Sequence, residues 1–161
     1  MTKRTNFFFF TLVLGVIASC SVDRDPCLLP KNTSMRLGTY QLVDTNNAVI
    51  DSFLPKPIWI AIDSNRGIQF LDNSSKFSLQ LSSITDSCRY TLQPDSAIAS
   101  YDTLTFYYER RLQFLSNSCG YTYFFLLKNI RTTLNNIDSV KLTNPEVNSD
   151  ANTQEHVQIF F

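Results

Sequence analysis

Short runs in which apolar and polar side chains alternate constrain the fold of this chain most. In residues 77–81, phenylalanine and leucine alternate with serine and glutamine, which indicates a half-buried strand. The apolar runs 58–62 and 68–71 flank a turn-like segment, residues 63–67, and so predict a hairpin. Such runs recur about every 8–12 residues, with Asn, Asp, Ser, Pro and Gly between them, and the sequence has no helical amphipathic stripe of ten or more residues.

Further strand-like runs are predicted at residues 35–43, 89–93, 103–109, 121–127, 137–142 and 155–161. The run 121–127 is almost wholly apolar, which is typical of a central strand buried on both faces. The last run places Val157 and Ile159 on one face, and it is expected to be integral to a sheet. We therefore expect an all-β fold: an antiparallel β-sandwich, immunoglobulin-like or jelly-roll-like, as a single domain over residues 35–161.

The first 19 residues have the pattern of a secretory signal. Lys3 and Arg4 supply positive charge, and the apolar run 7–18 follows. Twelve residues at 1.5 Å each span roughly 18 Å as a helix, too short for a hydrocarbon core of ~30 Å. The prediction is therefore a removable signal peptide, residues 1–19, rather than a membrane anchor.

The segment Ile17-Ala18-Ser19-Cys20 resembles the lipobox of bacterial lipoproteins. That resemblance implies cleavage after Ser19, and acyl chains such as palmitate on the sulfur and the amine of Cys20. The membrane is then a partner through this lipid. Residues 20–34 are polar and turn-rich, and we interpret them as a lipidated, flexible tether. An ordinary signal with a cysteine at the cut by chance is the alternative.

Composition excludes several classes of function. Removing the signal leaves 161 − 19 = 142 residues, with 12 basic and 14 acidic side chains, so there is no basic face for nucleic acid. A single histidine is too few for a His-rich metal site or a histidine relay, and four glycines are too few for a phosphate-cradling loop. His156 is expected to be a partly exposed strand residue rather than a catalytic base. No enzyme activity, cofactor or metal is expected.

Three cysteines remain if Cys20 carries lipid, and three single pairings are possible. Cys88 lies on the apolar side of a predicted strand and is interpreted as a small buried hydrophobe. Cys27 and Cys119 lie beside the turn formers Pro26 and Gly120, where backbones can approach closely. This favours a Cys27–Cys119 disulfide, while the other two pairings stay open.

Three parts of the sequence are candidate binding sites. The cluster Glu109-Arg110-Arg111 is interpreted as a solvated strand end or bulge, with an anionic partner as the alternative. Residues 63–67 mimic the start of a calcium loop, but Ser74 stands where that loop needs a glutamate, so a hairpin turn is favoured. A third set, the aromatics, is expected either to pack the sheets or to form a sugar-stacking platform: Trp59, Tyr101, Tyr107, Tyr108, Tyr121 and Tyr123.

Several segments together resemble a family of small lipoproteins of one Gram-negative lineage, known only as a domain of unknown function. They are the lipobox, the second cysteine, residues 102–108, Ser118-Cys119-Gly120-Tyr121 and residues 155–161. The resemblance implies an outer-membrane location and, independently, the Cys27–Cys119 pair; it implies no activity. We expect a lipid-anchored, non-enzymatic envelope lipoprotein, an interaction or accessory module with an envelope-protein partner. The alternative is a surface lipoprotein that binds a glycan or small ligand through exposed aromatics.

Overall fold

The computed structural model describes residues 26–28, 33–43, 48–64, 66–69, 73–149 and 154–161. This part of the chain contains eleven strands and no helix, which confirms the all-β prediction. The strands are β1 (Ser34–Val43), β2 (Ala48–Asp51), β3 (Ile58–Ala61), β4 (Arg66–Gln69), β5 (Lys76–Gln80), β6 (Ser87–Gln93), β7 (Asp102–Ser116), β8 (Gly120–Thr132), β9 (Ser139–Leu142), β10 (Glu146–Val147) and β11 (Val157–Phe160).

The first sheet is organised around β1, which is long enough to pair with three other strands. Its first half pairs with β5 and its second half with β2, both antiparallel, so β5 and β2 follow one another along one side of β1. Thr39 lies where the two partners meet. Its backbone N–H donates to Ser75 O (2.9 Å) and its hydroxyl donates to Ser52 O (2.6 Å). This buried threonine thus supplies hydrogen bonds to two backbone carbonyl groups where β5 gives way to β2 along β1.

The other side of β1 pairs with β11, and this pairing is parallel. The last strand lies between β1 and the antiparallel β9, inside the sheet, as its apolar alternation predicts. The antiparallel prediction is therefore right for every other pair of named strands in the described residues, but it does not anticipate this one. Parallel neighbours need a long connection, and here almost the whole domain lies between β1 and β11.

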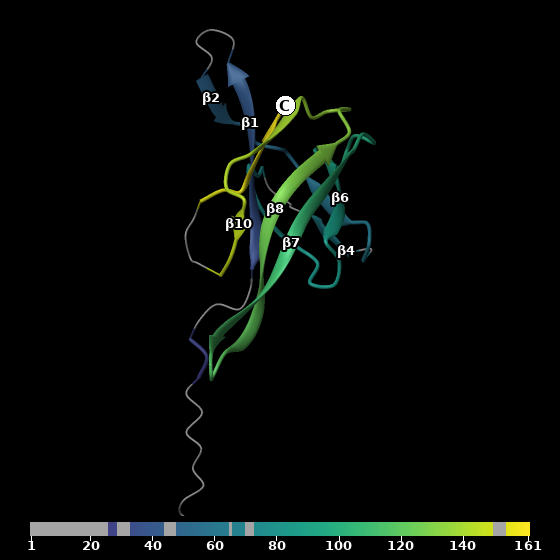
Figure 1. Cartoon of the computed structure of the whole chain (residues 1–161). Coiled ribbons are helices and arrows are strands. Elements are labelled where there is room, and N and C mark those ends of the chain that lie inside the picture. The colour runs from purple at the N-terminus through teal and green to yellow at the C-terminus, as the bar shows by residue number, and fades with distance from the viewer. Residues whose placement is uncertain (1–25, 29–32, 44–47, 65, 70–72, 150–153) are drawn as a thin grey trace, which may run out of the picture.

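The second sheet has the order β10-β8-β7-β6-β3-β4, with antiparallel pairing throughout. Trp59 of β3 lies 5.7 Å from Phe77 of β5, centroid to centroid, so the two sheets pack face to face (Figure 1). The prediction of a β-sandwich is confirmed. The predicted hairpin is also confirmed over the described residues, since β3 pairs with β4; residues 70 and 71 of its second predicted run lie outside them.

The core between the sheets is formed by apolar side chains at alternate positions. Those most completely buried are Met35, Leu37, Trp59, Leu79, Leu92, Leu104, Phe106, Ile137, Val147, Val157 and Ile159. Phe77, Leu79 and Leu81, which the alternation pattern places on one face, are all buried. Tyr90 and Tyr108 close the core at the connection between β5 and β6, where their hydroxyls bond to the backbone of Gln80 and Ser82.

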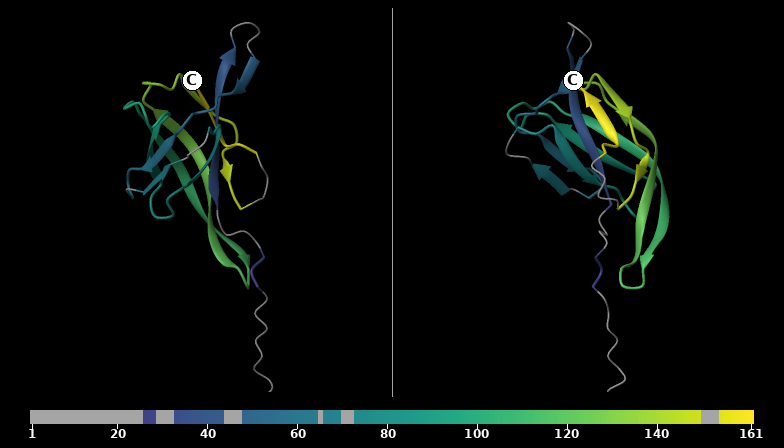
Figure 2. Two further views of the ribbon diagram at one scale, coloured as in Figure 1. Left: turned by 180° about the vertical axis from the view of Figure 1, so that it is seen from behind. Right: turned by 90° about the vertical axis from the view of Figure 1, so that its left-hand side faces the viewer.

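β7 and β8 are the two longest strands, and the hairpin that they form extends past the rest of the second sheet (Figures 1 and 2). Its neighbour β10 pairs only with Phe125 and Leu126. Residues 121–127 are therefore not buried on both faces, and that prediction is wrong. Phe125 and Leu127 are buried, whereas Tyr121 and Tyr123 lie on the part that extends past the core.

The molecule is elongated, with a different hairpin at each end. The closed end of β7–β8 lies at one end, beside the short described segment 26–28 (Figure 2). The β1–β2 hairpin lies at the other end.

Candidate interaction surface

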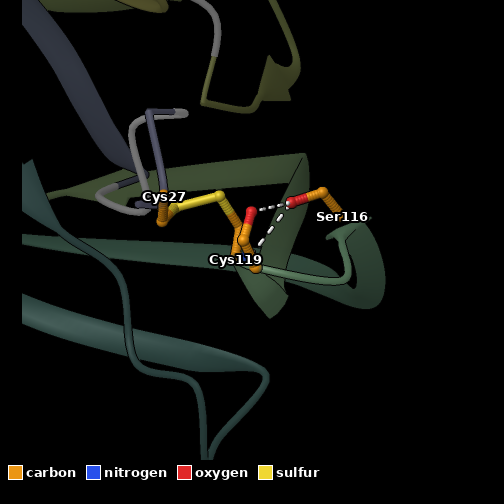
Figure 3. The surroundings of a disulfide bond; sticks show 4 residues. Cys27, Ser116 and Cys119 are labelled. Carbon is orange, nitrogen blue, oxygen red and sulfur yellow. Dashed lines mark hydrogen bonds between the residues drawn. A yellow bond between two sulfur atoms is a disulfide. The ribbon is translucent and has the colours of Figure 1, made fainter. Parts of the chain in front are cut away.

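A disulfide fastens the segment before β1 to the closed end of the β7–β8 hairpin. Cys27 and Cys119 are bonded, with their Cα atoms 4.8 Å apart, across 92 residues of sequence (Figure 3). The structure thus has the pairing favoured by the neighbouring turn formers. A second contact lies further along: the Thr33 hydroxyl donates to Tyr123 O (2.9 Å). The segment that leads into β1 is therefore held against β8 at two points.

The turn of this hairpin is built from a serine and a glycine. The hydroxyl oxygen of Ser116 accepts the backbone N–H of Cys119 (3.0 Å) and lies 3.1 Å from that of Ser118 (Figure 3). Gly120 has a φ of 71°, in the left-handed region that side chains disfavour. A Cβ there would meet nothing within 4 Å, so the backbone conformation rather than space requires glycine. The bonded Cys119 is thereby held rigidly at the tip.

Four apolar side chains lie together on one face of the projecting hairpin. Phe114 pairs with Tyr121 and Leu112 with Tyr123, and directly paired residues share a face. We call these four residues the hairpin apolar face. Their exposed fractions are 47%, 64%, 59% and 36%, in the order just given. The rings of Phe114 and Tyr121 lie 5.2 Å apart, tilted by 59°. The face continues the core side of the sheet beyond the core itself.

The same end of the hairpin carries no charge. From Leu112 to Leu127 the sequence contains no Asp, Glu, Lys, Arg or His, in a chain with 17% charged residues. A hollow of about 300 Å³ opens beside it, lined by Thr33, Gln80, Leu81, Ser83, Tyr121, Thr122, Tyr123 and Phe125. The combination is an exposed, neutral, aromatic surface next to a partly polar depression.

The predicted aromatic platform is therefore only partly present. Trp59 and Tyr108 are buried in the core and cannot stack on a ligand. Tyr107 points to the outer face of β7, where the Arg131 guanidinium lies 5.7 Å from its ring centroid. Tyr101 lies just before β7, at the end of that strand opposite to the hairpin tip. Of the predicted set, only Tyr121 and Tyr123 lie together. Leu112 and Phe114 complete their face; the pairing of β7 with β8, which the sequence pattern does not contain, places these two residues there.

The cluster Glu109-Arg110-Arg111 lies in β7 next to a register shift at Tyr107/Tyr108. Arg110 bonds to Asp86 (2.6 Å) and to Ser83 O (2.8 Å), and Glu109 pairs with Lys128 (2.9 Å). Two of its three charges are thus paired within the chain. In the segment predicted as a turn, residues 63–67, the side chain of Asp63 binds Arg89, while Arg66 and Gly67 already belong to β4 and pair with β3.

His156 is buried, with 2% of its surface exposed, so the prediction of a partly exposed residue is wrong. Its Nδ1 accepts the backbone N–H of Arg36 (2.9 Å), and its Nε2 lies 3.1 Å from Glu146 O. These partners require the neutral tautomer with the proton on Nε2. Burial and the nearby Arg36 charge lower the pKa of His156, outweighing both hydrogen bonds. The ring links β1 of one sheet to β10 of the other.

Cys88 is buried and not in a disulfide, which confirms its interpretation as a small core residue. Burial raises the pKa of its thiol to about 11. At neutral pH the sulfur is therefore protonated and a poor nucleophile.

A polar cluster that sequence reasoning missed lies on the first sheet. The Lys76 ammonium binds Glu155 (2.7 Å), Asp51 (3.0 Å) and the Tyr40 hydroxyl (2.7 Å), and Tyr40 donates to Glu155 (2.5 Å). Burial lowers the pKa of Lys76, but these bonds outweigh it and raise the pKa above its usual value. Burial and Glu155 raise the pKa of Tyr40. Both groups therefore hold their protons at neutral pH.

Gly38 makes room for that cluster. A Cβ at this position would lie 2.7 Å from the Glu155 carboxylate and 2.7 Å from the Tyr40 ring. The members come from β1, β2, β5 and the segment before β11, so no local sequence signal marks them.

Asp102 is a second polar residue that the sequence did not single out for this role. It is fully buried, and its carboxylate accepts bonds from Thr133, Asn135, Asn136 and Ile137 at 2.7–3.2 Å. Burial raises its pKa, but these bonds outweigh that effect and lower the pKa below its usual value. Its partners belong to the connection between β8 and β9, so the role is structural.

No three His, Cys, Asp or Glu residues in the described part of the chain are grouped so as to hold a metal ion. No helix there is long and apolar enough to cross a membrane.

Comparison with known proteins places the chain in one family. Residues 60–161 match a family described as "Family of unknown function (DUF6452)". The match includes Cys119 and the whole hairpin apolar face, and it begins after Cys20 and Cys27. No curated protein and no solved structure matches the chain. The match covers well over half of the sequence, and the chain therefore belongs to this family of unknown function.

Proposed function

We propose that the protein is a lipid-anchored, non-enzymatic lipoprotein of the outer membrane that acts as an interaction or accessory module. The observation that carries this proposal is the sequence Ile17-Ala18-Ser19-Cys20 after a charged start and a short apolar run. Two or more acyl chains on Cys20 are enough for stable anchoring, since a single chain gives only marginal binding. The residues between Cys20 and the disulfide-bonded Cys27 then tether the sandwich to the bilayer.

The disulfide supports this arrangement. Cys27 is seven residues from Cys20 and is bonded to the tip of β7–β8. An anchored chain would therefore hold that tip near the bilayer and direct the β1–β2 end away from it. At that far end Leu42 and Val49 are paired across β1 and β2, and both are exposed. This outward apolar pair is the surface that an envelope partner would meet first.

Four described residues of types that often carry catalysis are engaged or buried in the fold. His156 has both ring nitrogens occupied, the Cys88 thiol is buried, and Lys76 and Tyr40 hold their protons. These observations support a binding role over an enzymatic one.

The anchoring is tested by expressing the full-length protein in a Gram-negative host and separating membranes by flotation. The protein is expected with the membranes, and a Cys20→Ser variant in the soluble fraction. Cys27→Ser is the matched control, because it removes a neighbouring cysteine but keeps the lipid site. Soluble wild-type protein, or membrane-bound Cys20→Ser, would contradict the proposal.

A second candidate function is glycan binding. It is supported by the exposed Tyr121 and Tyr123, which lie beside a hollow that also presents Thr33, Gln80 and Ser83. Sugars stack on aromatic faces and bond to such polar groups. The full-length protein would be titrated with N-acetylglucosamine oligomers, and binding lost in Tyr121→Ala but kept in Tyr101→Ala would support this candidate.

A further inference from the structure

The hairpin apolar face is only partly covered by the described residues: Thr33 contacts the backbone of Tyr123 and lines the same hollow as the two tyrosines. In this part of the chain β10 reaches β8 only at Phe125 and Leu126, short of Tyr121 and Tyr123. Leu112 and Tyr121 are each more than half exposed. Exposed apolar side chains gathered on one face mark a surface that meets another apolar phase or partner.

The length of chain before the disulfide limits where this face can lie. Cys20 and Cys27 are seven residues apart, and a fully extended chain spans at most about 3.6 Å per residue, or roughly 25 Å. Cys119 is bonded to Cys27 and forms the tip of the hairpin. If Cys20 carries lipid, its backbone lies at the membrane surface, and the tip is within that reach of it.

The chemistry of the face fits the interfacial region of a bilayer. A charged side chain is expensive to move out of water, and the stretch from Leu112 to Leu127 contains none. Tyrosine is enriched at membrane interfaces, since its ring is apolar and its hydroxyl can stay hydrated. Tyr121 and Tyr123 supply two such rings, beside Leu112 and Phe114.

We propose that the hairpin apolar face is a second membrane contact, which enters the interfacial region of the leaflet that holds the lipid on Cys20. This inference rests on the proposed anchoring. The acyl chains give affinity, and the tip gives orientation: the disulfide keeps it close to the surface, and its aromatic side chains dock there. The sandwich is then oriented with its β7–β8 end at the membrane, instead of rotating freely about its tether.

The test uses a tryptophan placed on the face. Full-length lipidated protein carrying Tyr121→Trp is reconstituted into vesicles of phosphatidylethanolamine and phosphatidylglycerol, with plain or brominated acyl chains. Tyr101→Trp is the matched control: the same change, at a position of similar exposure (58%), beyond the opposite end of β7. The natural Trp59 is the chain's single tryptophan and is fully buried, so it gives an unquenched baseline.

In brominated vesicles the emission of the added tryptophan is expected to be lost for Tyr121→Trp and unchanged for Tyr101→Trp. The emission of Trp59 in the wild type is also expected to be unchanged. If all three proteins float with the vesicles but none is quenched, the contact is overturned and the anchoring stands. If none floats, the anchoring itself fails, and the contact with it. A change in the emission of Tyr121→Trp on adding N-acetylglucosamine oligomers, without bromine quenching, would assign the face to a glycan and overturn the contact.

Discussion

Asp102 orders the connection between β8 and β9 with a single side chain. Its carboxylate accepts the backbone N–H groups of Asn135, Asn136 and Ile137, and all of these are brought to the start of β7. Carboxylates that accept several backbone N–H groups are strongly held in the charged form. The connection therefore depends on one buried charge, much as a turn depends on its capping residue.

Replacing this charge is predicted to be costly. Asp102→Asn keeps the size of the side chain but turns one acceptor into a donor that faces backbone N–H groups. The free energy of unfolding is expected to fall by about 2–4 kcal/mol, measured by urea denaturation. Asp138→Asn, at an exposed position in the same region, is the control. An Asp102→Asn variant as stable as this control would show that the buried carboxylate is dispensable.

His156 is predicted to make stability depend on pH. The pKa of His156 is lowered in the fold, whereas the unfolded chain has a pKa of about 6.5. Below that pH the unfolded state binds a proton that the folded state does not, so stability is present above it and falls as the pH decreases. The loss is at most about 1.4 kcal/mol per pH unit.

Urea denaturation at pH 7.5 and pH 5.5 measures this effect. His156→Gln is expected to be less stable than the wild type at both pH values. The difference in its free energy of unfolding between the two pH values is expected to be mostly lost, since this is the single histidine of the chain. An unchanged pH dependence in the variant would mean that other groups cause it.

At the scale of elements, the β7–β8 hairpin depends on its disulfide for a fixed relation to β1. A loop of 92 residues closed by a disulfide is stabilised by up to about 4–5 kcal/mol in the chain-entropy model. Reduction is therefore predicted to lower the free energy of unfolding of the wild type. A Cys27→Ser/Cys119→Ser variant is expected to be insensitive to reductant.

Cys88→Ala is the control for this prediction, because Cys88 is free in the structure. It is expected to keep the full sensitivity to reductant. Loss of that sensitivity in Cys88→Ala would mean that a different pair of cysteines is bonded.

The strand β11 is predicted to be indispensable to the first sheet. It lies between β1 and β9, and Ile159 is fully buried. Ile159→Ala is expected to lower the free energy of unfolding by about 2–5 kcal/mol, as for other large-to-small changes in a core. Lys141→Ala, on the exposed side of neighbouring β9, is expected to change it by less than about 0.5 kcal/mol. Equal effects of the two substitutions in thermal or urea denaturation would contradict the position of β11.

Local pattern was enough to predict those features that depend on local geometry. The alternation at residues 77–81 and the turn at residues 63–67 indicate β5 and the β3–β4 hairpin, because a strand alternates its faces wherever it lies. Cys88 was correctly assigned to the core for the same reason.

Features that depend on distant partners were not predictable in this way. Whether a strand face is buried is decided by what lies over it: β10 covers His156, and nothing described covers Tyr121. The parallel pairing of β1 with β11 joins segments about as far apart as the domain allows. The Lys76 cluster and the hairpin apolar face likewise come from cross-strand register, which periodicity does not contain.

At the scale of the whole molecule, the two ends have different characters. One end carries the disulfide, an uncharged tip and the segment that leads to Cys20. The other carries the β1–β2 hairpin with exposed Leu42 and Val49. In the proposed function the first end faces the bilayer and the second faces a partner. That polarity depends on one feature of the proposal, lipid on Cys20.

The intact mass of the mature protein, purified from the envelope of a Gram-negative host, tests for this lipid directly. The expected protein begins at Cys20, carries acyl chains on that residue, contains one disulfide and has one free thiol that reacts only after unfolding. A mature chain that begins elsewhere, or that begins at an unmodified Cys20, would contradict the lipid anchor and the orientation derived from it.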